Sequence, residues 1–474
     1  MTSPGTPASD STTVALSSAR GRWIVLATVL GSTLSLLDGT VVTIALPDIG
    51  TDLGADVSGL QWTVTGYTLT LAAFVLLGGS LGDRFGRRRI FVVGTVWFAA
   101  ASIACGVAPN IEFLVIARVV QGIGAALVTP GSLAILSASI DREDRGRAIG
   151  LWSGFGGIGS AVGPLVGGYL VETVGWRAIF LINVPLAIVV AVVSVRHVPE
   201  SRDPGATGRL DIPGAVVVAS ALAALTYGAI SAQWVPIVLG LAGFAVFVMI
   251  ERRTAHPLVP LSLFGSRVFV AANVVTLAAY AALGGVFFLL LVQLQVALGY
   301  TALAAGVATL PITAALLLLS ARAGALAGRI GPRLPMTIGP LIASVGLLLM
   351  VRITPGSSYL GSVLPAVAVF GVGLSLLVAP LTAAVIGAAP ASHAGTASAV
   401  NNAVARTAQL LAVAAIPGVV GISGELNPET FASGFGRAMV LCAGLLAASG
   451  VVAAVTIRSE SVMKRGRAVN PRGT

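Results

Sequence analysis

The chain has 474 residues, of which 56% are hydrophobic and 10% are charged, and its mean hydropathy is +0.96. Soluble proteins carry about 25% charged residues, so this composition excludes an ordinary soluble domain and indicates an integral membrane protein. The net charge of +10 would suit a nucleic-acid-binding protein, but the positions of the basic residues argue against that function.

The apolar runs of the chain define its expected helices. Residues 1–20 are rich in Ser, Thr, Pro and Ala and are expected to form a disordered cytoplasmic tail. A spanning helix needs about 20 apolar residues, and the rest of the chain contains fourteen such runs. The expected spans are 23–47, 60–82, 90–108, 111–139, 147–171, 178–196, 214–232, 234–250, 268–298, 302–321, 335–353, 358–388, 396–421 and 437–457.

The distribution of positive charge predicts the orientation of these helices. An even number of spans places both termini on one side, and if that side is the cytoplasm, the inner loops and tails hold 23 of the 28 basic residues. Arg177, Arg352 and Arg437 then lie outside, and Arg118 and Arg406 lie within helices. This strong inside bias predicts a multi-pass protein of the plasma (inner) membrane with cytoplasmic termini. Its basic residues would face anionic lipid headgroups rather than nucleic acid.

A basic hinge, residues 78–89, follows the second expected helix. Glycine ends a helix readily because it accepts a positive φ, and the acid and arginines beyond it can pair with one another and with neighbouring helix ends. The pattern resembles the loop between the second and third helices of the major facilitator superfamily of transporters. That resemblance implies a loop that controls the conformational switch, carried here by Gly79, Asp83, Arg84, Gly86, Arg87 and Arg88.

The sequence also repeats weakly. Residues 79–88 align with 324–333 at an offset of 245, and residues 53–54 align with 298–299 at the same offset. Two matches in one register predict a duplicated unit. We therefore expect an N-terminal six-helix bundle over 21–196, a linker with two extra transmembrane helices over 197–267, a C-terminal six-helix bundle over 268–457, and a basic cytoplasmic tail over 458–474.

Asp38, in the first expected helix, is the one acidic residue placed deep in a predicted span. A carboxylate at the bilayer centre costs about 2.5–3.5 kcal/mol on insertion scales, so Asp38 is a candidate for proton coupling. The alternative is a structural aspartate neutralised by Arg118. At the helical rise, Asp38 lies about 14 Å and Arg118 about 12 Å from the outer ends of their helices. These matched depths predict an ion pair or a water-linked relay between the two residues.

The fifth expected helix carries Gly159, Gly163, Pro164, Gly167 and Gly168. The glycines spaced by four residues share one helix face and permit close packing, and the proline bends the helix. Plain packing would explain the glycines alone. The full Gly-Pro-x-x-Gly-Gly pattern resembles the antiporter motif of drug exporters.

Several polar side chains in the expected spans are candidates for lining a substrate cavity. Arg406 lies near mid-bilayer and could face Asp38, bond to carbonyl groups, or contact an anionic group of a substrate. A structural role, packed against helix ends or water, is the alternative. The candidate cavity residues are Gln121, Asn273, Gln293, Asn401, Asn402 and Arg406.

No cofactor or metal is expected. The chain has no phosphate-binding G-x-x-x-x-G-K-[ST] loop, and its single lysine is Lys464, so it should not hydrolyse ATP itself. The three histidines fall in expected loops and do not form a metal-binding pattern.

Over about residues 23–457 the chain resembles the fourteen-helix drug:proton antiporter family of the major facilitator superfamily, also through the run from Trp176 to Pro185. The resemblance implies an all-α membrane fold of two six-helix bundles plus two extra helices, and no enzymatic activity. It implies a monomer that exports drugs, antibiotics, dyes and other hydrophobic or amphipathic molecules, driven by the proton gradient. The second-half spans lack the acids that some relatives carry, which argues against polyspecific export of dications. The alternatives are a dedicated exporter of one endogenous metabolite, anionic if it meets Arg406, and a non-transporting sensor or scaffold.

Overall fold

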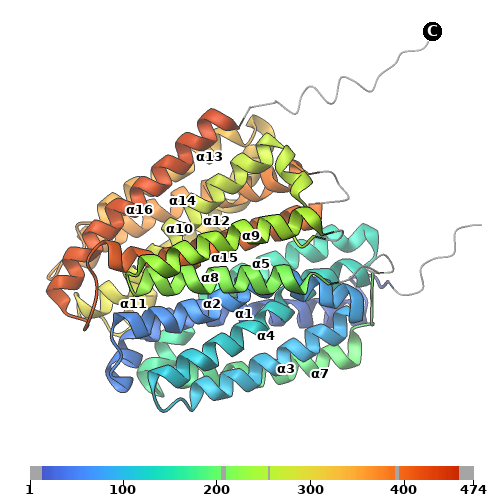
Figure 1. The fold of residues 1–474 in the computed structure, drawn as a ribbon, viewed down its shortest axis with the longest axis horizontal. Helices are drawn as coiled ribbons and strands as arrows, with labels where there is room; N and C mark the ends of the chain where they lie inside the picture. The colour runs from blue at the N-terminus through green and yellow to red at the C-terminus, as the bar shows by residue number, and fades with distance from the viewer. Residues whose placement is uncertain (1–12, 204–209, 255–256, 390–393, 458–474) are drawn as a thin grey trace, which may run out of the picture.

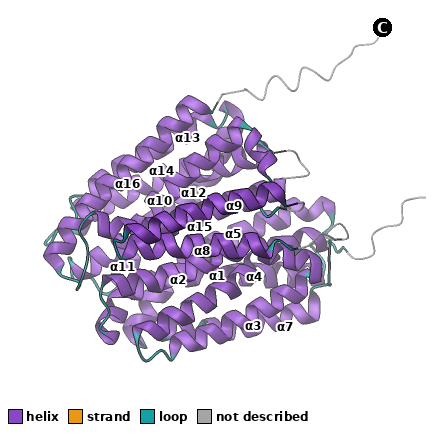
Figure 2. Cartoon of the chain, viewed as in Figure 1, coloured by secondary structure: helices purple, strands orange, loops and turns teal. Residues whose placement is uncertain are grey.

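The computed structural model describes residues 13–203, 210–254, 257–389 and 394–457. Within these ranges the regular structure is helical, apart from one isolated bridge between Val14 and Ile140 (Figure 2). Thirteen candidate spans in the described part are long and apolar enough to cross a membrane. The remaining expected span, 147–171, corresponds to α5 (Arg142–Thr173). The predicted all-α membrane fold is confirmed, and the predicted count of fourteen agrees to within one helix.

Most of the first half of the molecule, α1 to α7, occupies the lower part of Figure 1, and α5 reaches into its middle. α1 packs against α4, α5 and α7, while α4 also packs against α2 and α3. Polar caps start several of these helices; Asp56, for example, accepts a hydrogen bond from the backbone N–H of Gly59 at the start of α2. Besides α5, the elements are α1 (Ala19–Leu53), α2 (Val57–Phe85), α3 (Arg87–Gly106), α4 (Ile111–Ser139), α6 (Ala178–Leu181) and α7 (Asn183–His197).

The second half, α10 to α16, occupies the upper part of Figure 1. α10 packs against α15 and α16, and α13 packs against α14 and α16. Its elements are α10 (Arg267–Val296), α11 (Ala302–Ala308), α12 (Leu310–Ile330), α13 (Arg333–Met350), α14 (Leu364–Gly387), α15 (Ala394–Val419) and α16 (Pro428–Thr456). The short helices Leu261–Gly265 and Tyr359–Val363 precede α10 and α14.

The sequence repeat has a counterpart in the backbone. Gly54 and Gly299 have φ values of 62° and 69°, and Gly86 and Gly331 have φ values of 117° and 86°. Each pair is separated by the offset of 245 residues. Only glycine adopts such conformations without strain, so the same two turns close corresponding helices in both halves. This agreement supports the duplication inferred from sequence.

The helices extend beyond the apolar runs that predicted them. α5 begins at Arg142 rather than near residue 147, and α16 begins at Pro428 rather than near residue 437. Arg322, directly after the expected span 302–321, and Arg437, expected at the outer surface, therefore lie within α12 and α16. An apolar run marks only the part of a helix that suits the lipid interior, and a helix can continue into polar residues at its ends.

Two extra helices, α8 (Ile212–Ile230) and α9 (Trp234–Arg253), lie between the halves in the sequence and form a hairpin. α8 packs against α2 of the first half and α15 of the second half, so it covers the seam between them. Figure 1 shows this green hairpin in front of that seam. α9 lies outside α8 and buries only Gly240 and Glu251.

The two halves are joined by hydrogen bonds at one end. The Gln61 amide donates to the carbonyls of Val413 and Ala414 at 2.8 and 3.0 Å, and the Gln295 amide donates to the Ile44 carbonyl at 2.9 Å. The N–H of Val57 donates to the carbonyl of Gly424 at 3.0 Å. In the described part these are the hydrogen bonds between the halves. They define the closed end, which lies opposite the basic hinge.

Candidate functional site

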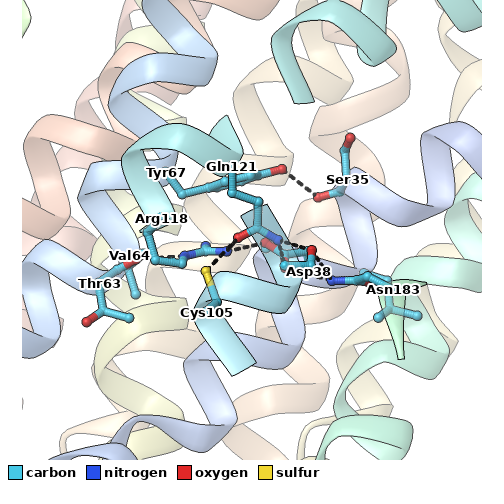
Figure 3. A network of polar contacts seen from close by, with 12 residues as sticks. Ser35, Asp38, Thr63, Val64, Tyr67, Cys105, Arg118, Gln121 and Asn183 are labelled. Carbon is cyan, nitrogen blue, oxygen red and sulfur yellow. Dashed lines mark hydrogen bonds and ion pairs between the residues drawn. The ribbon is translucent and has the colours of Figure 1, made fainter. Parts of the chain in front are cut away.

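A buried ion pair lies inside the first half (Figure 3). Arg118 Nη1 on α4 lies 2.5 Å from Asp38 Oδ2 on α1, and both residues are 1% exposed. Arg118 Nε also donates to the Thr63 carbonyl of α2 at 3.0 Å. The ion pair predicted from the equal depths of Asp38 and Arg118 in the membrane is therefore confirmed. A buried pair persists only when its remaining hydrogen-bonding groups are satisfied, and the neighbouring side chains meet this condition.

Gln121 and Asn183 complete the network around Asp38. The Gln121 amide donates to Asp38 Oδ1 at 2.9 Å and to the Ser102 hydroxyl at 2.8 Å, while its carbonyl oxygen accepts from Arg118 Nη1 at 2.6 Å. Asn183 Nδ2 donates to Asp38 Oδ1 at 3.1 Å. Gln121, predicted for the substrate cavity, is thus fully buried beside the ion pair. Sequence reasoning missed Asn183 as a partner of Asp38, although Asn183 belongs to the family-like run that ends at Pro185. It also missed Ser102, whose hydroxyl accepts from the Gln121 and Asn183 amides.

Tyr67 of α2 is a further neighbour of Arg118. The Arg118 guanidinium lies 4.3 Å from the centre of the Tyr67 ring, a favourable cation–π distance, and the Tyr67 hydroxyl donates to the Ser35 carbonyl at 3.2 Å. Arg406 of α15 interacts electrostatically with both Tyr67 and Tyr280. The charge of Arg406 therefore acts on Tyr67, and Tyr67 in turn contacts Arg118, the partner of Asp38.

Arg406 itself is half-buried and forms no hydrogen bond or ion pair with another residue in the described part. Asp38 already has three side-chain donors, Arg118, Gln121 and Asn183. The sequence had left pairing with Asp38, bonding to carbonyls and contact with a substrate open for Arg406. The observed contacts leave its guanidinium free to meet an incoming group.

The other second-half candidates have different surroundings. The Asn401 amide donates to Asn273 Oδ1 at 3.1 Å and to the Thr276 hydroxyl at 2.7 Å, so the two asparagines are brought together. Gln293 is fully buried, and its amide donates to the Ile353 carbonyl of the same half; this position does not fit the cavity lining predicted for it. Asn402 is exposed.

In the basic hinge, Asp83 forms an ion pair with an arginine of the same segment. Arg87 Nη2 and Nε lie 2.7 and 2.8 Å from Asp83 Oδ1, one turn earlier. Glu200, just after α7, accepts from the N–H groups of Arg88 and Arg89 at the start of α3. Glycine is favoured at position 86, because its φ of 117° is a conformation that other residues rarely adopt. The predicted pairing of Asp83 with the arginines and of the hinge with a neighbouring helix end is observed.

We expect Asp83→Asn to reduce turnover at least about tenfold, equivalent to about 1.4 kcal/mol, while substrate affinity in a state-locked background stays within about twofold. The residue lies far along α2 from the polar network and closes a clasp of the first half. A partly exposed ion pair contributes about 0.2–1 kcal/mol, so the variant should fold. The measurement is initial transport rate beside equilibrium binding. A large loss of affinity with turnover retained would contradict this role.

The glycine motif of α5 makes two kinds of close contact. A Cβ on Gly163 would lie 2.3 Å from the Thr40 hydroxyl, and one on Gly167 would lie 2.8 Å from Val41 of α1. Gly159 approaches Thr33 in the same way, as its shared face predicted. Gly168 instead meets the backbone of α11 in the second half. The motif therefore packs α5 within its own half and also brings the halves together at the closed end.

Comparison with known proteins identifies the family. A sequence model of the Major Facilitator Superfamily matches residues 28–413. The chain is 36% identical over 417 residues to the multidrug resistance protein Stp of Mycobacterium tuberculosis, covering 85% of this chain and 77% of that protein. It is 33% identical to the puromycin resistance protein pur8 of Streptomyces alboniger, covering 94% of both. It is 34% identical to the tetracenomycin C resistance and export protein of Streptomyces glaucescens, covering 87% and 79%.

Solved structures agree on the fold. A bacterial homologue of the lysosomal transporter Spinster, in an inward-facing conformation, matches 94% of this chain and 98% of its own with a TM-score of 0.69 and 19% identity. The inward-open xylose transporter of E. coli matches 92% and 96% with a TM-score of 0.61 and 15% identity. The family match and these folds lead to one conclusion: the chain is a multi-pass membrane transporter that belongs to the major facilitator superfamily.

Proposed function

We propose that this chain exports hydrophobic or amphipathic drug-like molecules by exchange with protons. Relatives described as multidrug, puromycin and methylenomycin A resistance proteins support the export of such molecules. The observation that carries the exchange with protons is the Asp38–Arg118 pair, which is buried, fully surrounded by donors, and linked through Tyr67 to the free cation Arg406.

The proposed coupling follows from electrostatics in a dry site. A buried carboxylate keeps its charge only while its donors stay in place. When the halves move, α1 shifts relative to α4, and Asp38 takes up a proton whenever Arg118 no longer compensates it. Substrate binding near Tyr67 and Arg406 favours the arrangement in which Asp38 is charged and the proton has left. The exchange therefore needs no cofactor, and one chain holds all the residues that it uses.

We further propose that the termini and the basic hinge face the cytoplasm of the cell, with the chain in the plasma membrane. In that orientation the closed end, which contains Gln61, Gln295 and Gly424, faces outward. The structure then corresponds to an inward-facing state, like the conformations of the solved transporters that share its fold. Cysteine labelling of the hinge and of the closed end in intact cells tests this orientation.

A proton-gradient assay tests the proposed function. Purified protein in liposomes is given an imposed pH gradient, and uptake or efflux is followed for a panel of dyes, antibiotics and metabolites. We expect uphill movement of amphipathic compounds that stops when the gradient is collapsed. Transport that is only downhill, at a rate independent of the gradient, would remove proton exchange from the proposal.

A second candidate function, export of one anionic endogenous metabolite, is favoured by Arg406, whose guanidinium has no partner in the described part. The relatives include a probable actinorhodin transporter of Streptomyces coelicolor, 34% identical over 417 residues. The two functions differ in which compounds from the panel move, because a dedicated exporter would move one class only.

Arg406→Gln should weaken export of anionic compounds at least about tenfold and leave or improve export of cationic ones. The free guanidinium attracts an anion and repels a cation in a site of low dielectric. Rates for matched anionic and cationic dyes give the measurement. Arg437→Gln, which removes a charge from the exposed surface of α16, is the control and should change neither. Equal losses for both classes in Arg406→Gln would indicate a structural role for Arg406.

A further inference from the structure

Two buried acids meet where the extra hairpin is attached to the rest of the molecule. Asp211 caps the start of α8, where Oδ1 accepts from the N–H of Gly214 at 2.8 Å. Glu251 lies in the last turn of α9, and its Oε2 accepts from the N–H of Val259 at 3.0 Å. Asp211 is 6% exposed and Glu251 is 3% exposed. Neither residue belongs to the network around Asp38.

The remaining oxygen of each carboxyl has no donor. Asp211 Oδ2 and Glu251 Oε1 are buried without a hydrogen-bond partner, while the two side chains lie within hydrogen-bonding reach of each other. Two ionised carboxylates in this position would repel and would leave both oxygens unsatisfied, at a cost of about 1–3 kcal/mol for each unmade bond and more for charged groups. One proton between the two oxygens satisfies both.

No cation is among the described groups that act on Glu251. The interactions that act on Glu251 come from Asp211 and from the backbone of Leu258 and Val259. Arg252 and Arg253, next in the chain, are exposed. Arg209, two residues before Asp211, and His256, five residues after Glu251, lie outside the described residues. The experiment below tests Arg209, and His256→Gln is tested in the same way.

We propose that Asp211 and Glu251 bind one proton between them, and that this proton clasps together the two linkers of the α8–α9 hairpin. Through Asp211 the pair holds the end of the linker from the first half. Through Glu251 and the N–H of Val259 it holds the start of the linker to α10. The hairpin packs over the α2–α15 contact. The shared proton between Asp211 and Glu251 therefore stabilises the attachment of the hairpin at this position. This site is separate from the proposed proton exchange at Asp38 and does not depend on it.

Infrared spectroscopy of the purified full-length protein tests the shared proton directly. At neutral pH the wild type should show the carbonyl-stretch band of a protonated carboxyl group. Glu251→Gln and Asp211→Asn should each lose an amplitude equal to one carboxyl, because the new amide donates to the remaining carboxylate and no proton is needed. Both variants keep size, and asparagine is as good a helix N-cap as aspartate, so both should fold. Asp38→Asn is the control, and the part of the band that belongs to this pair should survive in it.

The dependence of stability on pH gives a second readout. Carboxyl groups of an unfolded chain are ionised at neutral pH, so the folded chain would bind one proton more than the unfolded chain. Stability should then fall as pH rises through the range in which the pair loses its proton. The thermal midpoint should decrease with rising pH in the wild type and should change less in Glu251→Gln, whose amide is a permanent donor.

The results that overturn the proposal are equally definite. If neither single substitution reduces the protonated-carboxyl band, both acids are ionised and the clasp does not exist. If Arg209→Gln creates a band that the wild type lacks, an arginine rather than a proton compensates the pair.

Discussion

Asp38→Asn should abolish uphill efflux driven by a pH gradient, and substrate should no longer release protons from the purified protein. Asparagine keeps the size of the side chain but cannot exchange a proton. Downhill movement of substrate can continue, because the substitution disturbs the buried network of Arg118 and not the side chains proposed to meet the substrate, Tyr67 and Arg406. The measurements are proton release into a weakly buffered detergent solution and concentrative transport in vesicles.

The controls separate coupling from folding. Removing one partner of a buried ion pair costs about 3–5 kcal/mol, since Arg118 would keep its charge without Asp38. The double variant Asp38→Asn with Arg118→Gln removes both charges and should recover thermal stability while remaining uncoupled. Glu112→Gln changes an exposed acid at the start of α4 and should leave coupling intact. If Asp38→Asn still concentrates substrate, the proton follows another route.

Gly168→Val should prevent the closed end from forming and should reduce transport at least about tenfold. A Cβ at this position would lie 2.6 Å from the Cα of Leu303 and 2.7 Å from the Ala302 carbonyl oxygen. These are backbone atoms of α11, which cannot rotate away as a side chain can. Overpacking typically costs about 1–3 kcal/mol, and each 1.4 kcal/mol changes a population about tenfold.

The distance between spin labels at Ala55 and Ser423 reports this effect, because both positions flank the hydrogen bond from Val57 to Gly424. Gly168→Val should broaden that distance distribution toward longer separations. Gly154→Val is the matched control on the same helix, since a Cβ at Gly154 meets nothing within 4 Å. A normal distribution together with normal transport in Gly168→Val would show that α5 and α11 can separate at no cost.

Sequence reasoning predicted the features that depend on composition or on position along one helix. Apolar runs predicted the membrane helices, and the equal depths of Asp38 and Arg118 predicted their ion pair. Glycines spaced by four residues predicted a close-packing face on α5, and the structure shows that this face meets α1. Each of these features can be worked out from one helix, or from two helices that cross the same bilayer.

Features that depend on the rotation of a helix about its own axis could not be predicted in this way. Gln293 and Asn273 lie on one helix, yet Gln293 donates to Ile353 while Asn273 accepts from Asn401. The partnership of Asn183 with Asp38 needs the break at Ile182, between α6 and α7. The meeting of Asp211 with Glu251 likewise requires the hairpin to be closed.

The hairpin makes the two long seams of the transporter unequal toward the surrounding bilayer. α8 lies over the contact between α2 and α15, whereas the contact between α5 and α11 is flanked by α1 and α12, which belong to the two halves themselves. A compound that approaches from within the bilayer would meet α8 in front of the α2–α15 contact on one side. On the other side it would meet the α5–α11 contact directly, where Gly168 packs against α11. Such compounds would therefore reach the space between the halves more easily at the α5–α11 contact. A bulky residue there would affect the entry of these compounds as well as the closing of the two halves.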